Sequence, residues 1–260
     1  MFKHLIKYTQ SILIFGLGMI CIKACQKAQT VDQAQKIVDQ AIKAHGGKIF
    51  DQANVEFKFR DRYYKSSRMN GKYRYERFWD SLGIIIHDEL SNSGFIRHVG
   101  ETMVILDSKK IDSYTSSING VMYFFGIPFN LNDPGVIKEY LGEVTLMAQR
   151  YDKIKISFEA DPTNRLIHDD TYVYWINKDS HTIDYLGYDY TEPDDKGTRF
   201  RQAINARMVS GLRVQDYVNF KPINDSIALA PEDLDQAWIG HQLVELSKII
   251  NENVKVTLKK

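Results

Sequence analysis

The sequence predicts a mainly β fold of the α+β class: a strongly curved antiparallel sheet with helices packed on its concave side. Runs in which apolar and polar residues alternate, separated by Gly and Asn turns, recur from Val55 onward. Two other stretches, near the N-terminus and after Asp107, carry apolar residues at three- and four-residue spacings. The hairpin from Tyr172 to Tyr190 is apolar on both faces, so both faces need cover.

Residues 1–24 are expected to be an export signal. Lys3, His4 and Lys7 precede the apolar run Ser11–Ile22. That run is shorter than the roughly 20 residues that a permanent membrane helix needs, so a cleaved signal is favoured over an uncleaved anchor.

The end of this signal carries both cysteines of the chain, Cys21 and Cys25. The tetrad Ile22-Lys23-Ala24-Cys25 resembles a bacterial lipobox, in which the cysteine is acylated and becomes the new N-terminus. The resemblance implies a lipid anchor at Cys25, and Gln26 after it implies the outer membrane, facing the periplasm or the cell exterior. A simple secretory signal cut nearby is the alternative.

Composition limits what the exported part can do. Removing the signal lowers the formal net charge from +1 to −2 and leaves no basic surplus, so no nucleic-acid partner is expected. A single remaining cysteine that carries lipid allows no disulfide. Since no repeat, low-complexity tract or linker divides them, residues 25–260 are predicted to form one domain.

The first predicted element is a helix over residues 26–47. Its apolar stripe contains Val31, Ala34, Ile37, Val38, Ala41 and Ile42. Gly46 and Gly47 end it, and the macrodipole favours His45 in the last turn, which gives this histidine a structural role rather than a catalytic one.

A meander of antiparallel strands follows and is interrupted by a second helix. Asp107 is the expected N-cap of this helix, which fills the concave side and covers the hairpin. Its apolar side is formed by Ile111, Tyr114, Ile118, Val121 or Met122, and Phe125. The next segment, Tyr123–Leu131, is too apolar for an exposed loop, so it is either buried or held for a partner.

Strands resume after Pro134, and the Tyr172–Tyr190 hairpin is among them. Strand alternation places Tyr172, Tyr174 and Ile176 on one face, with Val173 and Trp175 on the other. In the second strand it places Ile183 and Tyr185 together, opposite Leu186, Tyr188 and Tyr190. A helix near Pro231–Ile239 and a C-terminal strand complete the chain.

This order of elements, with the hairpins YVYWINKDSHTIDYLGYDY and RMVSGLRVQDYVNF, resembles the half-barrel of periplasmic lipoprotein carriers and related lipid-binding lipoproteins. The segments AIKAHGG, YFFGIPFNLNDPGVIKEYLGE and YVYWI resemble still more closely a family of bacterial lipoproteins known only as a domain of unknown function. The carrier resemblance implies an apolar cavity that takes acyl chains. A solid core with no cavity is the alternative, because a cavity and a packed core produce the same alternation of apolar residues in the sequence.

Nine side chains are candidates for contact with an apolar ligand. The tyrosines among them keep a hydroxyl that suits a pocket mouth. The candidates are Tyr114, Ile118, Val121, Phe125, Tyr172, Tyr174, Trp175, Tyr185 and Arg201.

Arginines on alternating strand positions have two interpretations. We expect Arg74, Arg199, Arg201 and Arg207 to pair with carboxylates on the outer surface. If one or two instead reached a cavity mouth, their planar fork would bind a phosphate or carboxylate head group.

Catalytic motifs are absent from the sequence. It has no Gly-x-Ser-x-Gly elbow, His-Glu-x-x-His pair, P-loop or Gly-x-Gly-x-x-Gly. His87-Asp88 and His168-Asp169-Asp170 are the remaining acid-base or metal candidates, and we expect them to be surface polar residues. The acidic residues Glu192, Asp194 and Asp195 are expected to form a solvated turn.

These observations predict a non-catalytic cell-envelope lipoprotein that binds a lipid or another apolar ligand and uses no cofactor or metal. The alternative is a structural or assembly lipoprotein with a solid core that docks an envelope protein through the hairpin or Tyr123–Leu131. A hydrolase using His87 or His168 is a third hypothesis.

Overall fold

The computed structural model describes residues 32–159, 171–192, 195–224 and 229–259. The predicted export signal, Cys25, the His168-Asp169-Asp170 cluster and Asp194 lie outside this part of the chain. Only the backbone of Glu192 and Asp195 is described, so the solvated turn stays a prediction.

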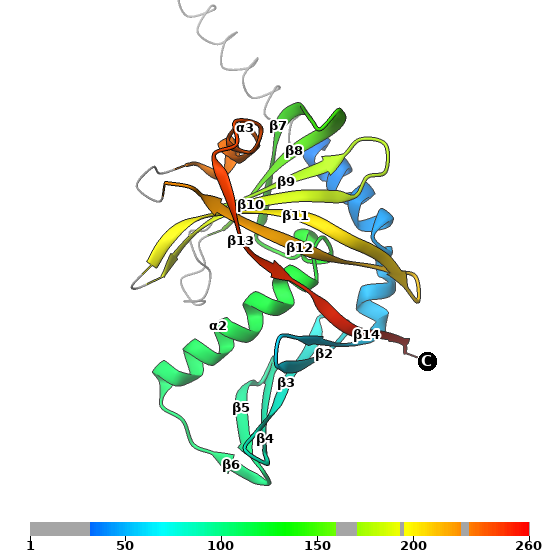
Figure 1. Ribbon diagram of the computed structural model, residues 1–260. Coiled ribbons are helices and arrows are strands. Elements are labelled where there is room, and N and C mark those ends of the chain that lie inside the picture. Colours follow the sequence, from blue (N-terminus) through cyan, green and yellow to red (C-terminus); the bar gives the residue numbers. More distant parts are fainter. Residues whose placement is uncertain (1–31, 160–170, 193–194, 225–228, 260) are drawn as a thin grey trace, which may run out of the picture.

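Two seven-stranded antiparallel sheets make up most of the molecule (Figure 1), which confirms the predicted mainly β half-barrel class. The N-terminal sheet contains, in spatial order, β14 (Asn251–Leu258), β1 (Ala53–Phe59), β2 (Arg62–Met69), β3 (Lys72–Ser81), β4 (Ile84–Ser91), β5 (Gly94–Val99) and β6 (Thr102–Val104). The C-terminal sheet contains, in spatial order, β13 (Leu243–Ile249), β12 (Leu212–Pro222), β11 (Asp195–Val209), β10 (Ile183–Glu192), β9 (Tyr172–Asn177), β8 (Gln149–Phe158) and β7 (Val136–Leu146).

The two sheets are joined at their edges by the end of the chain. Only Ile250 separates β13, which pairs with β12, from β14, which pairs with β1. Figure 1 shows these strands crossing from one sheet to the other as one continuous red ribbon. The predicted single curved sheet is therefore divided in two by its hydrogen bonding.

The N-terminal helix, described over residues 32–44, packs on the C-terminal sheet and continues into the short 3-10 helix η1 (Gly47–Gln52). Its side chains in the core are Ala34, Ile37, Val38 and Ala41. The carbonyl of His45 accepts a hydrogen bond from the Arg213 N–H at 2.9 Å. Gly46 has φ +122°, and a Cβ there would lie 2.7 Å from the Gly211 carbonyl, so only glycine fits this close approach.

Helix α2 (Ser108–Phe125) begins where the sequence predicts, because the Asp107 carboxylate accepts a hydrogen bond from the Lys110 N–H at 2.8 Å. One side of it packs on the N-terminal sheet, from the fully buried Ile118 to the last residue, Phe125, whose ring stacks on Phe57 with centroids 4.0 Å apart. The expectation that this helix covers the hairpin is wrong for most of its length. Among the residues described, no helix combines the length and apolarity needed to cross a membrane.

Both faces of the hairpin β9–β10 are covered, by different elements. The inner face, which includes Tyr174 and Ile176, packs under the N-terminal helix. The outer face, which includes Val173 and Trp175, is covered by η3 (Pro231–Asp233) and α3 (Leu234–Ile239). Lys153 and the buried Asp235 form an ion pair with N···O 3.0 Å beneath α3.

A register shift in β10 changes one predicted face. Ile183 pairs with Ile176 and Tyr185 pairs with Trp175, with an irregularity between them. Ile183 therefore lies on the inner face with Leu186, whereas Tyr185 lies on the outer face. The prediction that Ile183 and Tyr185 lie on the same face is wrong, because an extra residue in one strand reverses the alternation of faces after it.

The apolar connection Tyr123–Leu131 was predicted to be either buried or held for a partner, and most of it is buried. Ile127 and Leu131 belong to the inner core, and Phe129 stacks on Phe50 with centroids 4.6 Å apart. The short 3-10 helix η2 (Phe129–Asn132) lies within this packed region.

Candidate ligand-binding site

An aromatic cluster lies where the C-terminal end of α2 meets the inner face of the C-terminal sheet. We call it the aromatic junction and define it as Tyr123, Phe124, Phe158, Tyr172 and Tyr188. Tyr172 stacks on Tyr188 at 5.5 Å, and Phe124 contacts Tyr188 at 5.0 Å between centroids. All five side chains are only partly buried, in contrast to the fully buried Tyr174 beside them. The junction therefore presents an aromatic surface that the fold leaves partly uncovered.

Two tyrosine hydroxyls join α2 to the sheet at this junction. The Tyr123 and Tyr174 hydroxyls lie 2.9 Å apart and share a hydrogen bond. Burial raises the pKa of Tyr174 well above its usual value, and the neighbouring Tyr123 adds to the shift. Tyr174 therefore keeps its proton, and the pair holds the end of the helix against β9 without a charge.

Arg201 of β11 lies beside the junction on the same face. Its guanidinium carbon is 3.7 Å from the Phe124 ring centroid and 5.0 Å from that of Tyr188. Nη2 donates a hydrogen bond to the Tyr188 hydroxyl at 2.7 Å. The side chain is only 7% exposed, and its buried Nε has no hydrogen-bond partner. No carboxylate of the described residues forms an ion pair with it.

The nine predicted ligand residues fall into three places. Arg201, Tyr172 and Tyr174 meet at or beside the aromatic junction. Those carried by α2, which are Tyr114, Ile118, Val121 and Phe125, face the N-terminal sheet. Trp175 and Tyr185 lie on the outer face, where the Trp175 Nε1 donates to Asp235 at 3.3 Å, so the sheet separates them from any site on the concave side.

Four members of the junction were not among the candidates predicted from the sequence: Tyr123, Phe124, Phe158 and Tyr188. Two patterns in the sequence could have indicated them: the aromatic residues at the end of α2, and the position of Tyr188 two residues after Leu186, which places both on the same face of the strand. The missing information was that only the end of α2 reaches the hairpin.

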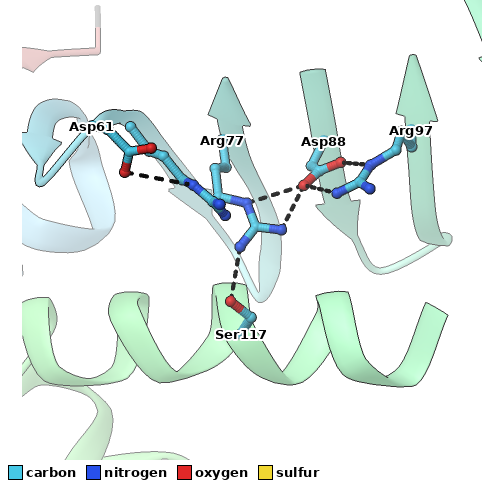
Figure 2. A network of polar contacts seen from close by, with 6 residues as sticks. Asp61, Arg77, Asp88, Arg97 and Ser117 are labelled. Carbon is cyan, nitrogen blue, oxygen red and sulfur yellow. Dashed lines mark hydrogen bonds and ion pairs between the residues drawn. The ribbon is translucent and has the colours of Figure 1, made fainter. Parts of the chain in front are cut away.

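Arginines also lie on the inner face of the N-terminal sheet, but there they meet a carboxylate (Figure 2). Asp88 is completely buried and accepts from Arg77 Nη2 at 2.6 Å and from Arg97 Nε at 2.6 Å. Arg77 Nη1 also donates to the Ser117 hydroxyl of α2 at 2.8 Å, and the Arg97 guanidinium lies 3.7 Å from the Tyr114 ring. The expectation that Asp88 is a surface residue is wrong. Its network fixes the middle of α2 to the sheet.

The structure does not bring His87 and Asp88 together as an acid-base pair. His87 lies on the opposite face from Asp88, as alternation predicts, and its Nε2 is 2.9 Å from Glu76. His45 accepts a hydrogen bond from the Ile183 N–H at 3.1 Å, and burial, with a smaller contribution from Arg213, lowers its pKa to about 3. Its structural role is thus that of a neutral acceptor rather than a cation at a helix end. The described residues contain no group of three or more potential ligands that could hold a metal ion.

The other predicted arginines differ in their partners. Arg74 pairs with Glu89 at 2.6 Å and Arg207 with Asp216 at 3.2 Å, as expected. Arg199 contacts the Tyr190 ring, with its guanidinium carbon 4.7 Å from the centroid, and has no carboxylate partner among the described residues.

A groove of about 370 Å³ lies on the outer face of the N-terminal sheet. Tyr63, which is 45% exposed, and Phe78 stack in it with centroids 5.4 Å apart. Lys58, Lys65 and Lys255 line it together with Glu56, so it is a mixed aromatic and basic surface.

The chain belongs to a family of unknown function, DUF6503, which matches residues 13–233. This confirms the family resemblance inferred from the sequence. No curated protein has a sequence that matches the chain.

Several solved structures are similar to the chain. A DUF1329 family protein from Desulfovibrio piger has a TM-score of 0.48 at 12% identity, covering 85% of this chain and 92% of its own. A LolA superfamily protein from Nitrosomonas europaea has a TM-score of 0.46 at 10% identity, covering 87% and 94%. A domain named for outer-membrane lipoprotein sorting, from Vibrio parahaemolyticus, has a TM-score of 0.45 at 10% identity, covering 87% and 93%. At these scores, nothing about a ligand follows from the similarity.

Proposed function

We propose that this member of the DUF6503 family is a non-catalytic cell-envelope lipoprotein, anchored through Cys25, that binds a lipid or another apolar ligand at the aromatic junction. The observation that carries the proposal is the partial exposure of five clustered aromatic side chains on the concave side, beside a fully buried core. Exposed apolar surface of this kind, gathered in one place, is typical of binding sites.

The chemistry of the junction suits an acyl chain. Tyrosine and phenylalanine rings offer apolar contact area, while the tyrosine hydroxyls keep polar partners at the rim. Burying an acyl chain contributes about 0.8 kcal/mol per CH₂ group, so a long chain is retained without covalent chemistry. The predicted N-terminal export signal and the lipobox-like tetrad support a location in the cell envelope.

The test is to express the full chain, purify the protein natively, compare its mass before and after denaturation, and identify any lipid that is released. We expect an apolar molecule in stoichiometric amount. Replacing both Tyr172 and Tyr188 by alanine should weaken its binding by about tenfold or more, because two aromatic contacts are lost. Tyr63→Ala, an exposed tyrosine on the outer face, is the matched control and should keep the ligand. A mass that stays at the apo value after incubation with envelope lipids contradicts the proposal.

The groove at Tyr63 and Phe78 favours a second function, the docking of an envelope protein. Apart from the residues of the aromatic junction, the apolar side chains of the segments first expected to dock, the hairpin and Tyr123–Leu131, are largely covered by the chain's own helices and core. If Tyr63→Ala abolished a complex with an envelope protein and left the lipid content unchanged, the docking function would be supported.

A further inference from the structure

We propose that Arg201 binds the anionic head group, a carboxylate or a phosphate, of an amphiphilic ligand whose apolar chain lies against the aromatic junction. The inference rests on the proposed function, because it assigns the class of ligand that the same site takes.

Arg201 lacks a counter-charge among the described residues. A guanidinium is charged at every physiological pH, and only 7% of the Arg201 surface is exposed. Burial of a charge is costly unless a partner of opposite charge meets it. Its only hydrogen bond among the described residues goes to the neutral Tyr188 hydroxyl. A ligand anion would supply the charge that the described protein groups do not.

The geometry around Arg201 leaves donors of its guanidinium unused. Phe124 and Tyr188 contact the guanidinium through their rings, which positions it without using its N–H groups, apart from the one that reaches the Tyr188 hydroxyl. Nε points its proton at no acceptor. A guanidinium with unused donors is suited to the paired oxygens of a carboxylate or phosphate.

The neighbouring strand adds a second unsatisfied polar atom. Arg201 pairs in register with Asn219 of β12, and the Asn219 Oδ1 is also buried without a hydrogen-bond partner. Two unsatisfied polar atoms from facing positions are rare in a finished core, where buried polar atoms are normally paired. Arg199, two residues before Arg201, adds a second guanidinium without a carboxylate partner among the described residues. The positive charge is thus concentrated at one end of the aromatic surface.

The arrangement therefore matches an amphiphile in both of its parts. The rings of the junction contact the acyl chain of the ligand. Arg201 binds its head group at the side of the junction that β11 and β12 form. A neutral lipid would satisfy the rings but leave the arginine without a counter-charge.

The experiment uses the protein purified after expression of the full chain, with bound lipid removed, and titration calorimetry with four probes. Palmitate and hexadecyl phosphate carry the anion, hexadecanol has the same chain without charge, and inorganic phosphate has the anion without the chain. We expect both anionic amphiphiles, or one of them, to bind at least about tenfold more tightly than hexadecanol, as charge-assisted hydrogen bonds imply. The tighter of the two identifies the head group.

Variants assign the preference to Arg201. Arg201→Gln should remove the preference, so that this variant binds the anionic probes no more tightly than it binds hexadecanol. Arg74→Gln is the matched control, since it removes the same charge from the outer face and should change none of the affinities. A preference for the anionic probes that survives in a folded Arg201→Gln protein would overturn the assignment.

Wild-type protein alone also decides the question, so the proposal does not depend on a variant that folds. Equal affinity for hexadecanol and the anionic amphiphiles would overturn the head-group inference and leave the proposed function standing. Binding of none of the long-chain probes would overturn both. If inorganic phosphate bound as tightly as hexadecyl phosphate, the ligand would be a free anion and the amphiphile inference would fail.

Discussion

Helix α2 packs on two sheets that both present buried arginine, but only one of them also presents a carboxylate partner for it among the described residues. Near the middle of the helix, Arg77 and Arg97 share the buried carboxylate of Asp88 (Figure 2). At the C-terminal end, Arg201 contacts Phe124 and Tyr188 and has no carboxylate partner in the part of the chain that is described. The same chemical group therefore occupies a complete network in one region and an incomplete one in the other.

This difference separates a structural role from a binding role. The Asp88 network uses both carboxylate oxygens and reaches Ser117 of the helix, so it already satisfies most of the groups it buries. Arg201 keeps an unused N–H beside an aromatic surface that is itself partly exposed. We infer that the Asp88 network holds the helix in place and that the Arg201 site binds a ligand.

The largest expected effect comes from breaking the complete network with Asp88→Asn. The change leaves two guanidiniums facing each other without a counter-charge, so the free energy of unfolding should fall by about 3–5 kcal/mol. Urea denaturation measures it. Glu89→Gln, at the next residue but with an exposed partner in Arg74, should cost less than about 1 kcal/mol. Comparable losses in the two variants would contradict the assignment of Asp88 as the central residue of a buried network.

A pH titration tests another buried ionisable group, His45. Its native pKa of about 3 lies below the unfolded value of 6.5, so the unfolded state binds the extra proton between these pH values. Stability should therefore be fully present above pH 6.5 and fall as the pH drops, by about 2 kcal/mol between pH 7 and pH 5. Denaturant unfolding at both pH values measures the loss.

The matched variant for this titration is His45→Gln, which keeps a side-chain acceptor for the Ile183 N–H but cannot titrate. It should be less stable than wild type at pH 7 and lose less stability between pH 7 and pH 5. An equal pH dependence in the two proteins would show that His45 is not the group responsible.

The sequence predicted the elements well where the signal is local. The Asp107 cap, the period of two in the strands and the two covered faces of the hairpin all follow from residues close together in the chain. The bulge between Ile183 and Tyr185 did not, because an extra residue in a strand leaves no distinct pattern, and it moved Tyr185 to the outer face.

The candidate site was harder to predict because it depends on pairings between distant segments. Alternation put Asp88 opposite His87, yet nothing in the local pattern said which face was inner, since arginines and carboxylates alternate on outer strands as well. Arg201 was a candidate, but its lack of a carboxylate partner depends on which residues β10 and β12 place beside it. Phe124 was missed because α2 was expected to cover the hairpin along its whole length.

The smallest expected effect on stability comes from Arg201→Met in the lipid-free protein. Because the arginine is buried without a counter-charge, replacing it by an apolar side chain of similar length should change the free energy of unfolding by less than about 1 kcal/mol, or raise it. Arg77→Met, the matched change in the complete network, should cost clearly more, since it removes two hydrogen bonds to Asp88 and one to Ser117. Urea unfolding of both variants measures the contrast. If Arg201→Met were as destabilising as Arg77→Met, Arg201 would be a structural residue like Arg77, and the distinction between a complete and an incomplete network would be lost.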